Sequence, residues 1–236
     1  MARTAVTKRG AIPRRRFRRK RKFSRRARMR PSRGLPLSGV SSRQIARLRY
    51  CEEISLDASA VSVAGFDFHA NGLYDPNKTG GGHQPQGFDR LMDLYDHYYV
   101  LSAKITVLPV FNGQSNVNPG VWGILVTDKA NAHATFSNVT HLLESKQFNS
   151  VPQFHGLLNS HLVPKSKSRK LSIKKFIGKS PISDDNRGSN AANPQEDIFF
   201  NVFAAPIGSN DPGALNFIVR IDYIALFTEL KQQPQS

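Results

Sequence analysis

The sequence predicts an all-β protein, an antiparallel jelly-roll sandwich with long loops that follows a disordered basic arm at the N-terminus. Three observations lead to this fold class. Apolar and polar residues alternate along several segments that turn residues separate. Patterns with a helical period are few, and neither a strand–helix–strand rhythm nor an internal repeat occurs. Charge is also strongly segregated, since residues 1–49 hold 19 Lys and Arg and no Asp or Glu.

The arm and the body differ in net charge. The 236 residues contain 34 Lys and Arg against 17 Asp and Glu. Beyond residue 49 there remain 34 − 19 = 15 basic and 17 acidic residues, a net charge of −2. We therefore expect residues 1–44 to form an arginine-rich arm and linker, and residues 45–236 to form one folded domain with its own core.

Several classes of protein are excluded by composition. No apolar run reaches 18 residues, so we expect no membrane span and no membrane insertion. Basic sequence with prolines fills the first 33 positions, where a secretory signal would have its apolar core. The single cysteine, Cys51, rules out an internal disulfide framework and is typical of a reducing compartment such as cytosol or nucleus.

The densest positive charge lies between residues 14 and 30. Like charges at this density repel one another, so we expect disorder until a polyanion neutralises them. Arginine forks suit phosphate oxygens, and Phe17 and Phe23 suit stacking on unpaired bases. A solvated tail and a nuclear localisation signal are the other interpretations. No base-reading motif is present, so we predict sequence-independent nucleic-acid binding by Arg14, Arg15, Arg16, Arg18, Arg19, Lys20, Arg21, Lys22, Arg25, Arg26, Arg28 and Arg30.

A flexible linker rich in Pro, Gly and Ser is expected over residues 31–44. Beyond it, alternation and short apolar runs predict seven or eight strands, with a bulge near Gly65. Two short helices are expected over residues 88–95 and 139–143. The predicted strands cover residues 48–57, 61–68, 99–107, 120–127, 170–177, 198–205 and 215–227.

No arrangement of residues indicates catalysis. Gly178-Lys179-Ser180 resembles the end of a phosphate-binding loop, but that motif needs a glycine where Ile173 stands. The seven histidines lack paired ligand spacing, and no thiolates accompany them. We therefore predict no enzyme activity, no cofactor and no metal site.

A second basic cluster lies inside the body, and no acid occurs between Glu144 and Asp184. Either it is a solvated strand face, or it faces the same way as the arm and contacts phosphate. In the second case we expect Lys170, Lys174 and Lys175 to bind nucleic acid. The cluster comprises Lys165, Lys167, Arg169, Lys170, Lys174, Lys175 and Lys179.

Residues 70–107 carry a resemblance to a known family. Residues 70–89 read ANGLYDPNKTGGGHQPQGFD, and residues 98–105 read YYVLSAKI. Together with the arginine-rich arm, they resemble the coat proteins of circovirus-like small circular single-stranded DNA viruses. The resemblance implies a jelly-roll shell domain, sixty copies in an icosahedral virion, and an arm turned inward onto the genome. It also implies assembly in the host nucleus, with nuclear import factors and a host-cell receptor as partners.

Two functions from different classes follow. The first is a self-assembling viral capsid protein that packages single-stranded DNA through its arm, although similar coats also enclose RNA. The second is a cellular nucleic-acid-binding protein of ribosomal or chromatin-like type. The body's net charge of −2 favours the first, because ribosomal-type proteins usually spread basic residues over the body. An enzyme and a lectin-like ligand-binding jelly roll are more distant alternatives.

Overall fold

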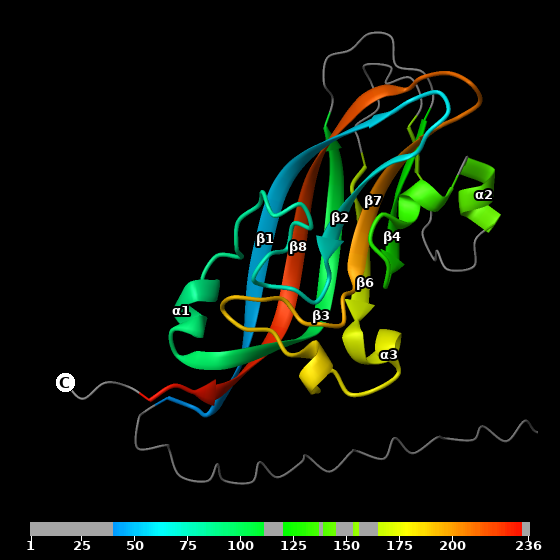
Figure 1. The fold of residues 1–236 in the computed structure, drawn as a ribbon. Coiled ribbons are helices and arrows are strands. Elements are labelled where there is room, and N and C mark those ends of the chain that lie inside the picture. The colour runs from blue at the N-terminus through cyan, green and yellow to red at the C-terminus, as the bar shows by residue number, and fades with distance from the viewer. Residues whose placement is uncertain (1–39, 111–119, 137–138, 145–152, 156–164, 233–236) are drawn as a thin grey trace, which may run out of the picture. The chain divides into compact units, whose positions relative to one another are not determined.

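The computed structural model describes residues 40–110, 120–136, 139–144, 153–155 and 165–232. The arm and most of the expected linker lie outside these ranges. The described residues form two four-stranded antiparallel sheets (Figure 1). The first sheet has the strand order β1 (Arg43–Ala58), β8 (Gly213–Leu230), β3 (Tyr95–Val110) and β6 (Lys167–Ser172). The second has the order β2 (Ala64–His69), β7 (Phe199–Pro206), β4 (Gly120–Thr127) and β5 (Gln153–His155).

The connectivity is that of a jelly roll. Its strands pair antiparallel as β1 with β8, β2 with β7, β3 with β6, and β4 with β5. These nested pairs alternate between the two sheets, so a single long hairpin is wrapped into a sandwich of eight strands. The predicted fold class is confirmed.

Short helices decorate the connections between strands. Both helices expected from the sequence are present as α1 (Phe88–Met92) and α2 (Val139–Glu144), but α1 is shorter than expected because Tyr95 already belongs to β3. Among the described segments there are also α3 (Ile173–Ile177) and two 3₁₀ helices, η1 (Ala132–Thr135) and η2 (Asp184–Asn186). None of the described helices is both long and apolar enough to cross a membrane.

Several details of the predicted strands are wrong. The expected bulge near Gly65 does not occur, because β2 pairs with β7 without a register shift from Ala64 to His69. Val61 and Val63 precede the strand, beside a turn in which the Ser62 amide donates to the Ser59 carbonyl. The register shift lies instead in β3, between Val100 and Ser102. The strand β5 was not predicted.

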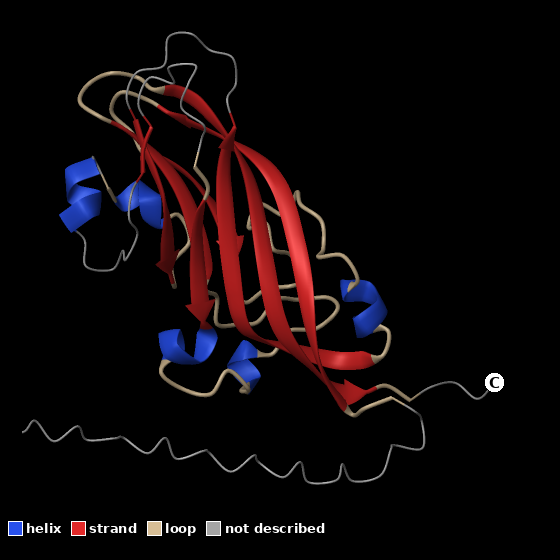
Figure 2. Cartoon of the chain, turned by 180° about the vertical axis from the view of Figure 1, so that it is seen from behind, coloured by secondary structure: helices blue, strands red, loops and turns tan. Residues whose placement is uncertain are grey.

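The two sheets bury their faces differently. Figure 2 shows the strands of the sandwich with the short helices beside them. Buried and exposed residues alternate along β1, so one face of the first sheet packs on the core and the other is open in the described structure. Every residue of β7 is buried. The main core lies on one face of the second sheet, and a smaller apolar cluster lies on the other. That smaller cluster includes Phe136, which follows η1, and Leu142 of α2.

Candidate nucleic-acid interface

The arginine-rich segment of the arm, Arg14 to Arg30, lies outside the described residues. Its role in nucleic-acid binding therefore stays a prediction. The three body lysines expected to bind nucleic acid are described, and all three are exposed. Lys170 lies in β6, whereas Lys174 and Lys175 lie in α3.

The strand predicted over residues 170–177 ends earlier than expected. β6 stops at Ser172 and α3 begins at Ile173, so the apolar residues Leu171, Ile173 and Ile177 follow a strand and then a helical turn. α3 ends at Gly178, whose φ of 73° is the left-handed conformation that glycine adopts readily. The second basic cluster is therefore split between a sheet face and a helix.

Lys179, at the far end of that cluster, is held by acidic residues. Its Nζ lies 3.3 Å from Glu196 Oε2 and 3.4 Å from Asp185 Oδ2. Hydrogen bonding to Glu196, and then to Asp185, raises the pKa of the Lys179 ammonium. Since these acids balance its charge, Lys179 is less suited to contact phosphate than Lys170 is.

Lys170 belongs to a row of charged residues that crosses all four strands of the first sheet. In the pairing register, Arg49 on β1 faces Asp222 on β8, Asp222 faces Lys104 on β3, and Lys104 faces Lys170 on β6. We call these four residues, with Arg220 two positions from Asp222 on the same face of β8, the cationic row. Its members lie on the open face of the sheet.

Asp222 holds the two arginines of the cationic row. Its Oδ1 accepts a hydrogen bond from Arg49 Nε at 2.7 Å, and its Oδ2 lies 3.3 Å from Arg220 Nε. The hydrogen bond with Asp222, and its negative charge, raise the pKa of the Arg49 guanidinium. Arg49 is 59% exposed while Asp222 is 19% exposed, so the guanidinium reaches solvent over a more buried carboxylate.

Sequence reasoning missed most of this row. Alternation placed Arg49, Lys104, Arg220 and Asp222 on the polar faces of their own strands. It did not show that those faces are the same surface, because strand pairing between residues far apart in sequence sets that surface. The sequence did contain one signal for this surface, because each of the four strands carries a basic residue on its polar face.

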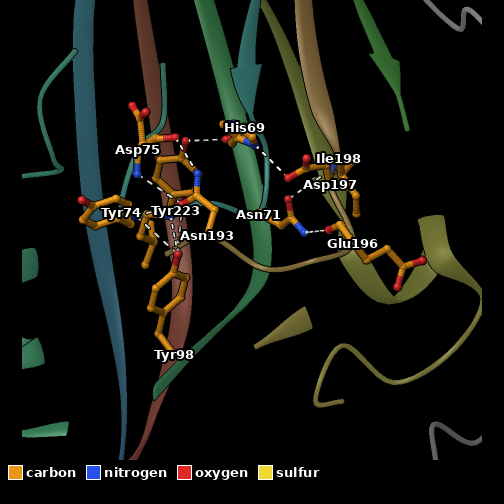
Figure 3. Close-up of polar contacts among 11 residues, drawn as sticks. His69, Asn71, Tyr74, Asp75, Tyr98, Asn193, Glu196, Asp197, Ile198 and Tyr223 are labelled. Carbon is orange, nitrogen blue, oxygen red and sulfur yellow. Dashed lines mark hydrogen bonds and ion pairs between the residues drawn. The ribbon is translucent and has the colours of Figure 1, made fainter. Parts of the chain in front are cut away.

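The family-like segment, residues 70–107, is built around buried hydrogen bonds (Figure 3). The Tyr98 hydroxyl accepts a bond of 2.9 Å from the Leu73 amide. Asn193 Oδ1 accepts from the amides of Tyr74 and Asp75, while Asn193 Nδ2 donates to the Asp75 carbonyl at 2.8 Å. Burial raises the pKa of Tyr98, so the phenol stays protonated. The two loops that carry residues 73–75 and 193 are therefore tied together by side chains.

A second set of contacts joins the same loops. Asn71 Nδ2 donates to the Glu196 carbonyl at 2.5 Å, and Asn71 Oδ1 accepts from the Ile198 amide at 3.1 Å (Figure 3). His69 Nδ1 lies 3.2 Å from Asp197 Oδ1, yet burial lowers the pKa of the imidazole. These groups are used in internal contacts, so the segment is a structural element of the fold.

The same segment also covers the edge of the first sheet. His83 Nε2 lies 3.0 Å from the Cys51 carbonyl oxygen, and the Gln86 amide donates to the Arg49 carbonyl at 3.3 Å. β1 is an edge strand, and these contacts use carbonyls that would otherwise face outward. Within the described ranges, no group of three or more His, Cys, Asp or Glu is placed to hold a metal ion.

Comparison with known proteins gives structural neighbours only. No protein-family model matches the sequence, and no curated protein matches it. The chain is similar in structure to the capsid protein of BFDV, a circovirus, in its decameric form, with 9% identity over 79% of this chain and 99% of that chain and a TM-score of 0.45. The family named by the sequence resemblance is thus represented among the neighbours.

Other neighbours are also viral. The chain is similar to the nodavirus particle of the giant freshwater prawn Macrobrachium rosenbergii, with 10% identity over 98% of this chain and 97% of that chain and a TM-score of 0.49. It is similar to Mud crab tombus-like virus, with 11% identity over 83% of this chain and 94% of that chain and a TM-score of 0.48. A second BFDV capsid structure is described as a 60-mer.

Proposed function

We propose that this chain is a viral capsid protein that self-assembles into a closed icosahedral shell and packages single-stranded DNA through its basic arm. The jelly-roll body forms the shell, and the arm of each copy lies on the genome. The protein resides in the virion and enters the host nucleus during assembly, with nuclear import factors and a host-cell receptor as partners. Lys170, Lys174 and Lys175 add to the nucleic-acid contact.

The segregation of charge is the observation that carries this proposal. The first 33 residues hold 16 Lys and Arg, whereas the chain beyond residue 49 nets −2. A uniformly cationic shell would repel itself at every subunit contact, so the task of neutralising a genome falls to a separate segment. Sixty arms would supply 60 × 16 = 960 positive charges, enough for roughly a thousand phosphates at one-to-one pairing.

The body has features that suit closed assembly. Its edge strands and long connections need to be covered, and symmetric packing of identical subunits covers them. Deleting residues 1–33 should therefore leave a protein that folds and still self-associates. A truncated protein that stays monomeric at high concentration would show that assembly depends on the arm.

The test is electron microscopy of purified full-length protein together with a measurement of its nucleic-acid content. We expect regular closed shells that protect nucleic acid from nuclease. Replacing the twelve basic residues between Arg14 and Arg30 with Ser should give particles with the absorbance ratio of pure protein. Particles of that variant that still hold a full complement of nucleic acid would contradict packaging by the arm.

The second candidate is a cellular nucleic-acid-binding protein of ribosomal or chromatin-like type. The sequence-independent chemistry of the arm is the observation that favours it. Such a protein would bind single strands with the same salt dependence but would form no shells. The same micrographs therefore distinguish the two functions.

A further inference from the structure

The open face of the first sheet carries a concentration of positive charge that the arm does not supply. The cationic row contains four cations, Arg49, Arg220, Lys104 and Lys170, and one anion, Asp222, for a net charge of 4 − 1 = +3. Arg47, two residues before Arg49 on β1, is also exposed on this face. The charge is assembled from all four strands, so only the folded sheet creates it.

The two lysines of the row are the groups best placed to bind a ligand. Asp222 forms ion pairs with both arginines and keeps their guanidinium groups close to the sheet. Lys104 and Lys170 are exposed and face each other in the pairing register. Among the described residues, neither has an acid within ion-pair distance. Two like charges on neighbouring strands repel each other, and an anion placed between them relieves that repulsion.

The size of the row matches a chain of phosphates. Neighbouring strands lie about 4.8 Å apart, so three steps from β1 to β6 span about 14 Å. One strand of B-form DNA carries one phosphate per about 3.4 Å of helix axis, and an extended single strand spaces its phosphates farther apart, so this distance holds at most about four phosphates. No aromatic residue belongs to the row, so it offers no platform on which bases would stack.

We propose that the cationic row is a second contact for the phosphate backbone of single-stranded nucleic acid, made by the folded domain and independent of sequence. The proposal rests on the proposed packaging function and adds to it a surface on the body. Charge complementarity selects this occupant over a second copy of the chain, because two faces with the same positive charge repel each other. The arm binds most of the nucleic acid, and the cationic row binds a short part of its backbone at the surface of the sheet.

The test uses the full-length chain with the twelve basic residues from Arg14 to Arg30 replaced by Ser, so that the arm no longer dominates binding. In this background, binding of a fluorescent oligothymidylate is measured as a function of salt. The variant Lys104→Gln/Lys170→Gln is compared with Arg90→Gln/Lys129→Gln, which removes the same charge from exposed residues of α1 and of the turn after β4. Lys104→Arg/Lys170→Arg restores the charge.

Loss of two phosphate contacts should reduce the salt slope by about 0.7 × 2 = 1.4 and weaken binding about tenfold near 0.15 M salt. The control pair should leave the slope unchanged, and the arginine pair should restore it. Equal slopes for the Gln variant and its background would overturn the proposal. So would a Gln variant of the unmodified chain that folds but no longer forms shells, because the face would then lie between copies.

The proposed function fails on a different observation. If the unmodified chain forms no shells, packaging is wrong, whatever the row binds. If shells form and the slopes are equal, only the row is wrong. Circular dichroism of each variant confirms that the sheet is intact before binding is compared.

Discussion

The two sheets of this jelly roll share one core but have different outer faces. On the second sheet, Phe203 and Leu125 lie in an apolar cluster with Phe136 and Leu142, beneath η1 and α2. On the first sheet, the outward positions of β1 and β3 are open in the described structure and include the charged residues Arg49 and Lys104. The sandwich thus has one face fixed by its own chain and one face available to a partner. Stability should reside on the covered side, and binding on the open side.

The largest expected effect on stability comes from removing the ring of Phe203, which packs the second sheet against Phe136 beside η1 and Leu142 of α2. Phe203 is fully buried, so Phe203→Ala should lower the free energy of unfolding by about 3–5 kcal/mol. The matched change on the open face, Ile218→Ala, removes a side chain that is 37% exposed and should cost less than about 1 kcal/mol. Denaturant unfolding of both variants measures the difference. Equal losses would remove the distinction between the faces.

A smaller effect is expected from crowding at the same place. A Cβ on Gly123 would lie 2.6 Å from the Phe203 ring, which faces it in the β4–β7 register. Gly123→Ala should therefore cost about 1–3 kcal/mol. The same change made in the Phe203→Ala protein should cost less, since the ring is gone, and a double-mutant cycle measures that coupling. Purely additive losses would show that the two residues do not interact.

The free energy of unfolding should also depend on pH, through the contact between η1 and the second sheet. His133 of η1 lies 2.8 Å from Asn201 Nδ2, and Asn201 also bonds Asp67 in the buried β2–β7 pair. Burial lowers the pKa of His133, partly opposed by Asp67. The unfolded chain therefore binds the proton more readily, so stability is complete above the unfolded pKa of about 6.5 and falls as pH drops toward the folded pKa.

Unfolding in denaturant at about pH 7.5 and about pH 5.5 measures this response. In His133→Gln the loss of stability on acidification should be smaller than in the unmodified chain. Some loss should remain, because burial also lowers the pKa of His69. If both proteins showed the same pH dependence, His133 would not be a source of the loss of stability at low pH.

The smallest effect is expected on the open face. Asp222→Asn removes the ion pairs with Arg49 and Arg220, which are 59% and 42% exposed. Exposed pairs contribute little, so the free energy of unfolding should fall by less than about 1 kcal/mol. A loss comparable to that of Phe203→Ala would mean that the open face supports the fold as strongly as the covered face.

The contrast between the faces was partly visible in the sequence. Continuous apolar runs at residues 120–127 and 198–205 became β4 and β7, which are buried on both faces. Alternation at residues 99–107 and 215–227 became β3 and β8, which have one open face. Hydrophobic periodicity reports burial directly, so these elements were predictable.

Other features depend on contacts that one sequence does not reveal. The apolar spacing of Leu171, Ile173 and Ile177 fits a strand, but Ile173 is buried at the start of a helical turn. The bulge expected at Gly65 is absent, and the His133 ring instead packs so closely on that glycine that a Cβ would lie 2.3 Å from it. The cationic row was missed for the same reason, since it exists only through the register of four strands.

The position of β8 in the first sheet also determines when that sheet can be completed during synthesis. β8 lies between β1 and β3 in the first sheet, although some 100 residues separate it from the end of β3. During synthesis, β1 and β3 leave the ribosome with no strand between them, and the sheet stays incomplete until residues 213–230 emerge. A chain halted before that point has neither a finished sandwich nor a cationic row. Nascent chains would thus complete their folded domain only after their last strand is inserted.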